Sequence, residues 1–202
     1  TLPNFIIMAP SNQNELIRMI NTSVLIDDRP SAFRYPRGAG EIDNTNLNYD
    51  SLEIGKGIII KEGNDVAILN LGTRMQSCEE AIKLLNSHNI YPTLADARFA
   101  KPIDKNLIDN LLDHHKYLIT IEEGSSGGFG SSVLNYIHNE RRKSTLTKVN
   151  NIYFPDKFID HQSPEDQYKE IGMDADSIAN KITKFYQDNI IDFETYNKNI
   201  KN

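Results

Sequence analysis

The sequence contains a single cysteine, Cys78, which excludes an intramolecular disulfide bond and any cysteine-rich metal site. Cys78 falls in a predicted helix with no histidine nearby, so we expect a buried or neutral thiol and not a nucleophile. A lone thiol is typical of a protein kept in a reducing compartment, and we therefore expect a cytoplasmic location.

Long apolar runs are absent, and so is the basic, apolar and small-residue pattern of a signal peptide. Positive charge is not in excess either, because the formal net charge is -6 and the Lys and Arg residues are dispersed. These absences argue against a membrane or a nucleic acid as partner. The chain begins at Thr1 and enters an apolar run at Phe5, so we expect a fragment that opens inside a domain.

The sequence also lacks histidines at the spacing of metal ligands. The five histidines are scattered, and no His-Glu-x-x-His pattern occurs, so we expect no metal bound by them. His161 follows a predicted strand end, and a surface position is the favoured interpretation for it.

The sequence is long enough for one complete domain and part of a second, because it has 202 residues. Its hydrophobic fraction of 39% is ordinary for a globular protein. The first part has the pattern of a strand at 5–9, a helix that starts near Ser11 or Asn12, and a strand at 31–35. These elements cannot bury a core alone, so they must pack against the rest of the chain or against something missing. Residues 43–54 lack a sustained period and predict a linker.

From residue 55 onward strands and helices alternate. The predicted strands lie at 57–61, 66–71, 91–95, 117–121 and 149–154. The apolar run that starts at Val66 is typical of a strand buried on both faces of a parallel sheet. The alternation predicts an α/β domain over 55–189, with a mainly parallel five-stranded sheet and helices on both faces, followed by a flexible tail at 190–202.

Two arginines and a tyrosine stand together at the end of the strand at 31–35, in the run Arg34-Tyr35-Pro36-Arg37-Gly38. A guanidinium group binds a phosphoryl group through two parallel hydrogen bonds, and proline and glycine end the strand. The side chains would then lie at the carboxyl end of a strand, where open α/β sheets place their ligands. The cluster therefore suits a phosphate, with a solvated surface or a structural ion pair as the alternative.

Polar residues also follow a later strand, namely Asp96, Arg98, Lys101 and Asp104. They could face a ligand or hold the loop together through salt bridges, and the sequence leaves both interpretations open.

Two carboxylates and a glycine-rich connection follow the strand at 117–121. Glu122 and Glu123 are neighbours on a strand and point to opposite faces, which argues against a carboxylate pair for acid–base catalysis. The glycines between Gly124 and Gly130 match neither the GxGxxG pattern nor a P-loop. Close packing of a helix on the sheet is therefore favoured over anion binding.

Six motifs, in order, closely resemble the C-terminal third of the 1-deoxy-D-xylulose-5-phosphate synthase family, over residues 2–188. Some of them, the Glu-Glu-Gly and Gly-Gly elements, also occur in transketolases and in the β subunits of 2-oxo acid dehydrogenases. The motifs are Ile7-Met8-Ala9-Pro10-Ser11 with Glu15, Arg34-Tyr35-Pro36-Arg37-Gly38, Ile68-Leu69-Asn70-Leu71-Gly72-Thr73, the stretch 96–104, Glu122-Glu123-Gly124 with Gly127-Gly128-Phe129-Gly130, and Pro155-Asp156-Lys157-Phe158-Ile159.

The resemblance implies a homodimeric transferase of the transketolase type. Such an enzyme condenses pyruvate with D-glyceraldehyde 3-phosphate on thiamine diphosphate and Mg²⁺, with release of CO2, and its product feeds isoprenoid, thiamine and pyridoxal synthesis. Residues 1–42 would be the end of the thiamine pyrimidine-binding domain, and 55–189 the complete transketolase C-terminal domain. Arg37 would bind the phosphate of the acceptor aldehyde, with Arg34 and Tyr35 as supporting residues.

The family's catalytic glutamate, its Gly-Asp-Gly metal motif and its active-site histidines have no counterpart in this sequence. We therefore expect the 202 residues alone to be inactive and to bind neither cofactor. The alternative is a noncatalytic module of the same fold, which serves dimer assembly or binds a regulatory anion.

Overall fold

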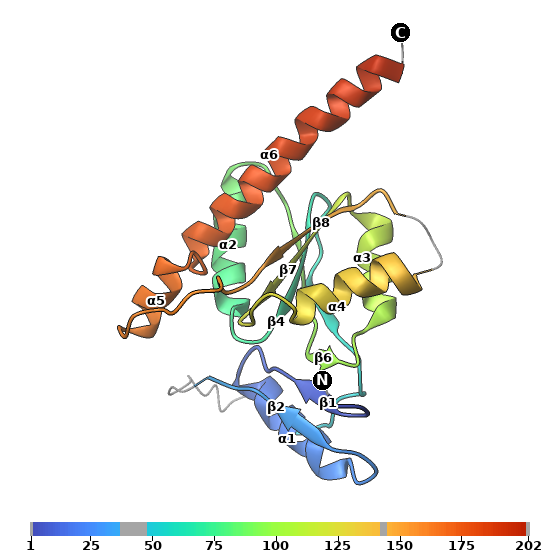
Figure 1. Cartoon of the computed structure of the whole chain (residues 1–202), viewed down its shortest axis with the longest axis vertical. Coiled ribbons are helices and arrows are strands. Elements are labelled where there is room, and N and C mark those ends of the chain that lie inside the picture. The colour runs from blue at the N-terminus through green and yellow to red at the C-terminus, as the bar shows by residue number, and fades with distance from the viewer. Residues whose placement is uncertain (1, 37–47, 142–144, 201–202) are drawn as a thin grey trace.

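The computed structural model describes residues 2–36, 48–141 and 145–200, with side chains described as far as residue 189 (Figure 1). It contains two sheets, and helices pack against both. In chain order the elements are β1 (Ile6–Met8), α1 (Gln13–Leu25), β2 (Ser31–Phe33), β3 (Ile58–Lys61), β4 (Ala67–Leu71), α2 (Met75–Ser87), β5 (Thr93–Asp96), β6 (Phe99–Lys101), α3 (Lys105–His114), β7 (Tyr117–Glu122), α4 (Phe129–Asn135), the π-helical turn η1 (Tyr136–Glu140), β8 (Lys148–Ile152), α5 (Pro164–Glu170) and α6 (Ala175–Ile200).

The larger sheet has the strand order β3-β5-β4-β7-β8. Strands β5, β4, β7 and β8 are parallel, and only the edge strand β3 runs antiparallel to its neighbour β5. Every residue of β4 and β7 is buried, as expected for central strands covered on both faces. Helices α2 and α6 pack on one face, and α3 and α4 on the other. The predicted α/β architecture is thus confirmed.

The smaller sheet joins the first part of the chain to the second. Its order is β2-β1-β6, with β1 parallel to β2 and antiparallel to β6. Phe99 on β6 is fully buried and packs with Ile6, Met8, Met19 and Leu52 of the first part. The first part therefore completes its core with a strand of the C-terminal domain, which is one of the two alternatives that the sequence left open.

Strand β6 is absent from the predicted elements, because the sequence indicates only a connection over 96–104. The strand has three residues, too few to show an alternating pattern, and its partner β1 is distant in the sequence. The pairing, which sets Ile7 opposite Lys101 and Met8 opposite Phe99, stabilises a segment that has no strand signal of its own.

The described end of the predicted linker lies along α1. Thr22 Oγ1 accepts a hydrogen bond from the Leu52 amide at 2.7 Å, and Asn21 Nδ2 donates to the Tyr49 carbonyl at 2.6 Å. Leu52 is buried, so this segment contributes to the core of the first part. Linker residues 43–47 lie outside the described residues.

Two element ends differ from the sequence prediction. Strand β2 ends at Phe33, before the arginine cluster. Helix α6 continues through Ile200, so the predicted helix end at 189 is wrong. The physical reason is that neither glycine nor proline follows Gly172, and nothing in the sequence ends the helix. The flexibility of the tail stays a prediction.

Within the described part of the chain, none of the helices has the length and apolar character needed to cross a membrane.

Candidate functional site

A pocket opens where the connections of the larger sheet change direction. After β4 the chain adds β5 on one side, and β7 then pairs on the other side of β4. In open α/β sheets, ligands bind outside the carboxyl ends of the strands at such a switch point. Here the two strands end at Leu71 and Glu122, and both residues line a pocket of about 870 Å³.

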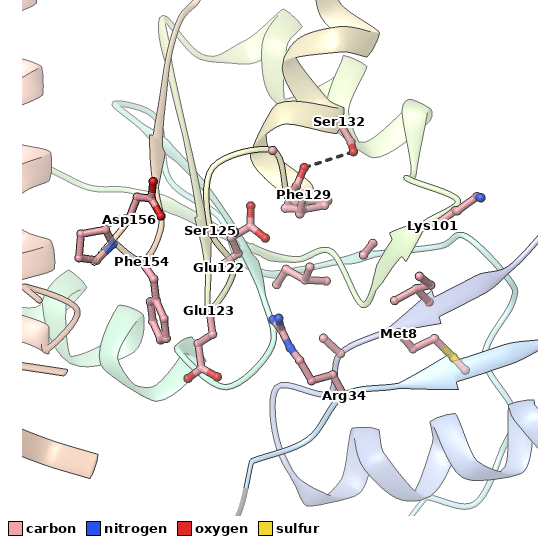
Figure 2. Close-up of a pocket in the computed structure, with 18 of the residues that line it drawn as sticks. Met8, Arg34, Lys101, Glu122, Glu123, Ser125, Phe129, Ser132, Phe154 and Asp156 are labelled. Atoms are coloured by element: carbon pink, nitrogen blue, oxygen red, sulfur yellow. Dashed lines mark hydrogen bonds between the residues drawn. The ribbon is translucent and has the colours of Figure 1, made fainter. Parts of the chain in front are cut away.

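Residues from several parts of the chain form the pocket walls (Figure 2). Strand β1, Arg34 and the end of β6 form one wall, the ends of β4 and β7 with the glycine-rich connection form another, and the loop after β8 forms the third. The lining residues are Ile7, Met8, Ala9, Arg34, Leu71, Ala100, Lys101, Glu122, Glu123, Gly124, Ser125, Gly127, Gly128, Phe129, Ser132, Phe154, Pro155, Asp156, Lys157, Phe158 and Ile159.

Arg34 brings a cation to this pocket from the end of β2. Its amide donates to the Met8 carbonyl at 2.9 Å, which fixes the main chain beside β1. Figure 2 shows the side chain extending toward the strand end that carries Glu122 and Glu123. Among the residues that the structure describes, the Arg34 guanidinium has no hydrogen-bond or ion-pair partner. Arg34 belongs to the run Arg34-Tyr35-Pro36-Arg37-Gly38, which we call the arginine motif. It therefore brings a positive charge of this motif to the pocket.

The other two residues of the predicted phosphate site are Tyr35 and Arg37. Tyr35 is 59% exposed, and its ring lies 6.0 Å from that of Phe33, away from the pocket lining. Arg37 lies outside the described residues, so its phosphate-binding role stays a prediction. Of the predicted site, the structure brings Arg34 to the pocket and leaves Tyr35 on the surface.

The glycine-rich connection wraps closely around the carboxylate of Glu122. Glu122 is 4% exposed, and its Oε1 accepts a hydrogen bond from the Gly130 amide at 2.8 Å. A Cβ atom would lie 2.3 Å from Glu122 Oε2 at Gly124, and 2.6 Å from it at Gly128. Only glycine fits at these positions without a shift. The predicted close packing of a helix on the sheet is confirmed at Gly130 of α4, where a Cβ atom would lie 2.7 Å from Thr120 Oγ1 on β7.

Glu123 belongs to a different network from Glu122. Its Oε1 accepts hydrogen bonds from Arg74 Nε and from the Tyr168 hydroxyl, each at 2.8 Å, and from Thr73. The Arg74 guanidinium also stacks 3.4 Å above the centre of the Tyr168 ring. Burial, together with the bond to Glu123, raises the pKa of Tyr168 to about 12. Glu123 therefore ties β7 to α2 and α5, and the two carboxylates form no acid–base pair.

The polar residues after β5 hold the loop together. Asp104 caps α3 by accepting from the Leu107 amide at 3.1 Å, and its other oxygen accepts from the Gly57 amide at 3.0 Å. Lys101 Nζ donates to the Leu2 carbonyl at 2.6 Å. Asp104 thus holds the loop together, whereas Lys101 also lines the pocket, so the ligand-facing interpretation stays open for Lys101.

Arg98, in the same loop, binds a partner that the sequence does not predict. Its Nη2 donates to Glu15 Oε1 at 2.8 Å, and both residues are buried. Glu15 lies on α1, 83 positions earlier, and no local signal connects the two. Nearby, burial raises the pKa of Asp96 to about 6, against hydrogen bonds from Ser11 and the Arg98 amide that lower it.

Other sequence candidates lie apart from the pocket lining. Cys78 is fully buried, which confirms the prediction of a buried thiol, and burial raises the pKa of that thiol to about 12. His161 is exposed, as expected. The described ranges hold no group of three His, Cys, Asp or Glu side chains that could bind a metal ion.

Comparisons with known proteins agree with this architecture. The chain is 45% identical over 180 residues to the probable 1-deoxy-D-xylulose-5-phosphate synthase 2, chloroplastic, of Oryza sativa subsp. japonica. It is 48% identical over 181 residues to the 1-deoxy-D-xylulose-5-phosphate synthase 1, chloroplastic, of Cannabis sativa. Each alignment covers 88% of this chain and 25% of the relative, so the chain spans about a quarter of the length of these relatives.

Among solved structures, the chain is similar to a split-gene transketolase, in the form of an inactive β4 tetramer. The TM-score is 0.79 at 25% sequence identity, and the match covers 91% of this chain and 58% of the other. Residues 55–178, which include the whole of the larger sheet and α2 to α5, match the family described as transketolase, C-terminal domain. This match covers more than half of the sequence, and the chain therefore belongs to the transketolase C-terminal domain family.

Proposed function

We propose that this chain is the C-terminal part of a 1-deoxy-D-xylulose-5-phosphate synthase. The whole enzyme would condense pyruvate with D-glyceraldehyde 3-phosphate, with loss of CO2. The observation that carries the proposal is the 48% identity to the Cannabis sativa synthase over 181 residues. This aligned stretch is longer than the family match at 55–178, so the relationship to the synthase also includes residues outside that domain.

The role that we assign to this chain is the binding of the acceptor phosphate. Arg37 would hold the phosphate of D-glyceraldehyde 3-phosphate, and Arg34 adds a second cation beside the pocket. A fixed guanidinium binds a phosphate dianion through charge-assisted hydrogen bonds and has no acid–base duty. Such a contact orients the aldehyde for attack and disfavours acceptors that lack a phosphate.

Thiamine diphosphate, Mg²⁺ and a homodimeric assembly belong to the proposal for the whole protein. In the part of the chain that the structure describes, no group of three metal-ligating side chains is present. These residues do not fit the metal, and we assign them no part in holding it or in the steps that occur on the cofactor.

An assay of the full-length protein tests the proposal. Supplied with thiamine diphosphate and Mg²⁺, it should release CO2 from pyruvate and form 1-deoxy-D-xylulose 5-phosphate when D-glyceraldehyde 3-phosphate is present. A transketolase would instead transfer a two-carbon unit from a ketose phosphate without releasing CO2. Two-carbon transfer in the absence of pyruvate decarboxylation would contradict the proposal.

A noncatalytic assembly subunit of the same fold is the second candidate. The similarity to a split-gene transketolase, solved as an inactive β4 tetramer, favours it. The reading frame that encodes this chain separates the two candidates. An upstream Gly-Asp-Gly motif and a pyrimidine-binding glutamate in the same polypeptide support the synthase. Activity that appears only after a separately encoded polypeptide is added supports the subunit.

A further inference from the structure

A buried ion pair joins the two parts of the chain. Glu15 lies on α1 and Arg98 directly precedes β6. Arg98 Nη2 donates to Glu15 Oε1 at 2.8 Å, and Arg98 Nε lies 2.8 Å from Glu15 Oε2. The two residues are 7% and 9% exposed. Glu15 Oε1 also accepts a hydrogen bond from Arg18 Nη1 at 3.0 Å, so Glu15 keeps a partner without Arg98. The Arg98 guanidinium depends on Glu15, and because a buried charge without a partner is strongly unfavourable, the pair fixes α1 against the start of β6.

The backbone of Arg98 is held in an uncommon conformation. Its φ is +56°, in the left-handed region that residues other than glycine rarely adopt. The Arg98 amide donates to Asp96 Oδ1 at 2.9 Å, which holds this turn from within the same loop. Strained residues of this kind persist where the surrounding contacts determine one geometry, and they gather at functional sites.

Strand β1 connects Arg98 to the arginine motif, because it lies between β6 and β2. The Ala9 amide donates to the Arg98 carbonyl at 2.9 Å. The adjacent Met8 carbonyl accepts from the Arg34 amide, also at 2.9 Å. Two main-chain hydrogen bonds, at the last residue of β1 and at the residue that follows it, thus separate Arg98 from Arg34, three positions before Arg37.

We propose that Glu15 and Arg98 are positioning residues for acceptor binding. The pair holds β1, and through β1 the main chain at Arg34, whose side chain lines the pocket proposed for the acceptor phosphate. This inference rests on the proposed function, because phosphate binding by the motif is part of that proposal. A purely structural pair would instead support the fold without any effect that depends on the acceptor's phosphate.

The test uses the full-length protein with saturating pyruvate and two acceptors, D-glyceraldehyde 3-phosphate and unphosphorylated D-glyceraldehyde. Glu15→Gln keeps the side-chain shape and removes the charge, whereas Arg98→Lys keeps the charge and loses the two-pronged guanidinium. We expect each variant to raise KM for the phosphorylated acceptor about 10-fold, with kcat changed less than about 2-fold. The kcat/KM for unphosphorylated glyceraldehyde should stay unchanged.

Glu140→Gln is the matched control, since it makes the same chemical change in the exposed ion pair with Lys105. It should alter neither acceptor's constants. Thermal unfolding establishes that each variant is folded. If Glu15→Gln does not fold, Arg98→Lys decides the question, because its lysine still neutralises Glu15.

If folded variants change KM equally for both acceptors, or for neither, the positioning role is overturned and the proposed function stays in place. An Arg37→Ala arm makes the two failures distinguishable. If the wild type lacks synthase activity, the proposed function is overturned and the positioning role falls with it. If the wild type is active but Arg37→Ala affects both acceptors equally, the motif does not bind the phosphate, and the positioning role falls while the synthase activity stands.

Discussion

At the scale of single residues, Asp96 gives the clearest pH-dependent prediction. Burial raises its pKa from 3.8 to about 6 in the folded protein, and the side chain is 1% exposed. Below pH 3.8 the carboxyl group is neutral in both states, so its contribution to stability is fully present. As the pH rises through 6, the folded protein must ionise a buried group, and up to about 3 kcal/mol of stability is lost.

Asp96→Asn imitates the neutral carboxyl group and keeps an acceptor for the Arg98 amide. We expect the variant to match the wild type near pH 3.5 and to be the more stable of the two at pH 7.5. Urea unfolding at the two pH values measures the difference, and the exposed Asp160→Asn serves as control. A variant that loses stability relative to the wild type as the pH rises would contradict the assignment.

At the scale of elements, β6 is expected to hold the two parts of the chain together through Phe99. This side chain is fully buried among residues of the first part, and truncation of a buried phenylalanine costs about 3 to 5 kcal/mol. Phe99→Ala should therefore lower the free energy of unfolding by about that amount. Phe158→Ala, at a fully exposed position, should leave it unchanged. Similar small effects for both variants would show that β6 does not form this core.

The Glu123 network predicts a smaller effect on the packing of α5. Tyr168→Phe removes one donor, but Arg74 and Thr73 still bind the Glu123 carboxylate. The expected loss is about 1 kcal/mol in urea unfolding. Glu123→Gln should cost more, because it leaves the Arg74 guanidinium without its carboxylate. A larger loss for Tyr168→Phe than for Glu123→Gln would contradict this ranking.

The elements also show how far the sequence predicts the structure. Strands such as β4 and helices such as α1 have local apolar patterns, and the sequence places them within a few residues. Strand β6 and the pair Glu15–Arg98 depend on contacts between distant segments, which no local pattern reveals. The residue types of the arginine motif suit a phosphate, whereas the role of Arg37 is implied only by the family resemblance. The pocket at the switch point follows from strand order, which only the structure supplies.

At the scale of the whole molecule, the arginine motif would act as part of a larger enzyme. The chain spans about a quarter of its synthase relatives, so the cofactor-binding residues of the proposed enzyme would come from the rest of the polypeptide. What this chain would supply is a C-terminal domain joined through β6 to the strands that precede the motif. The central claim is thus that the motif selects a phosphorylated acceptor.

The most direct measurement is steady-state kinetics of full-length Arg37→Ala with D-glyceraldehyde 3-phosphate and with unphosphorylated glyceraldehyde. Loss of a charge-assisted phosphate contact should remove about 2 to 3 kcal/mol of transition-state stabilisation, seen in kcat/KM, for the phosphorylated acceptor alone. Arg29→Ala, which breaks the exposed pair with Asp28, should change neither value. Equal losses for both acceptors, or none, would contradict the account, because Arg37 would then have no role in binding the phosphate.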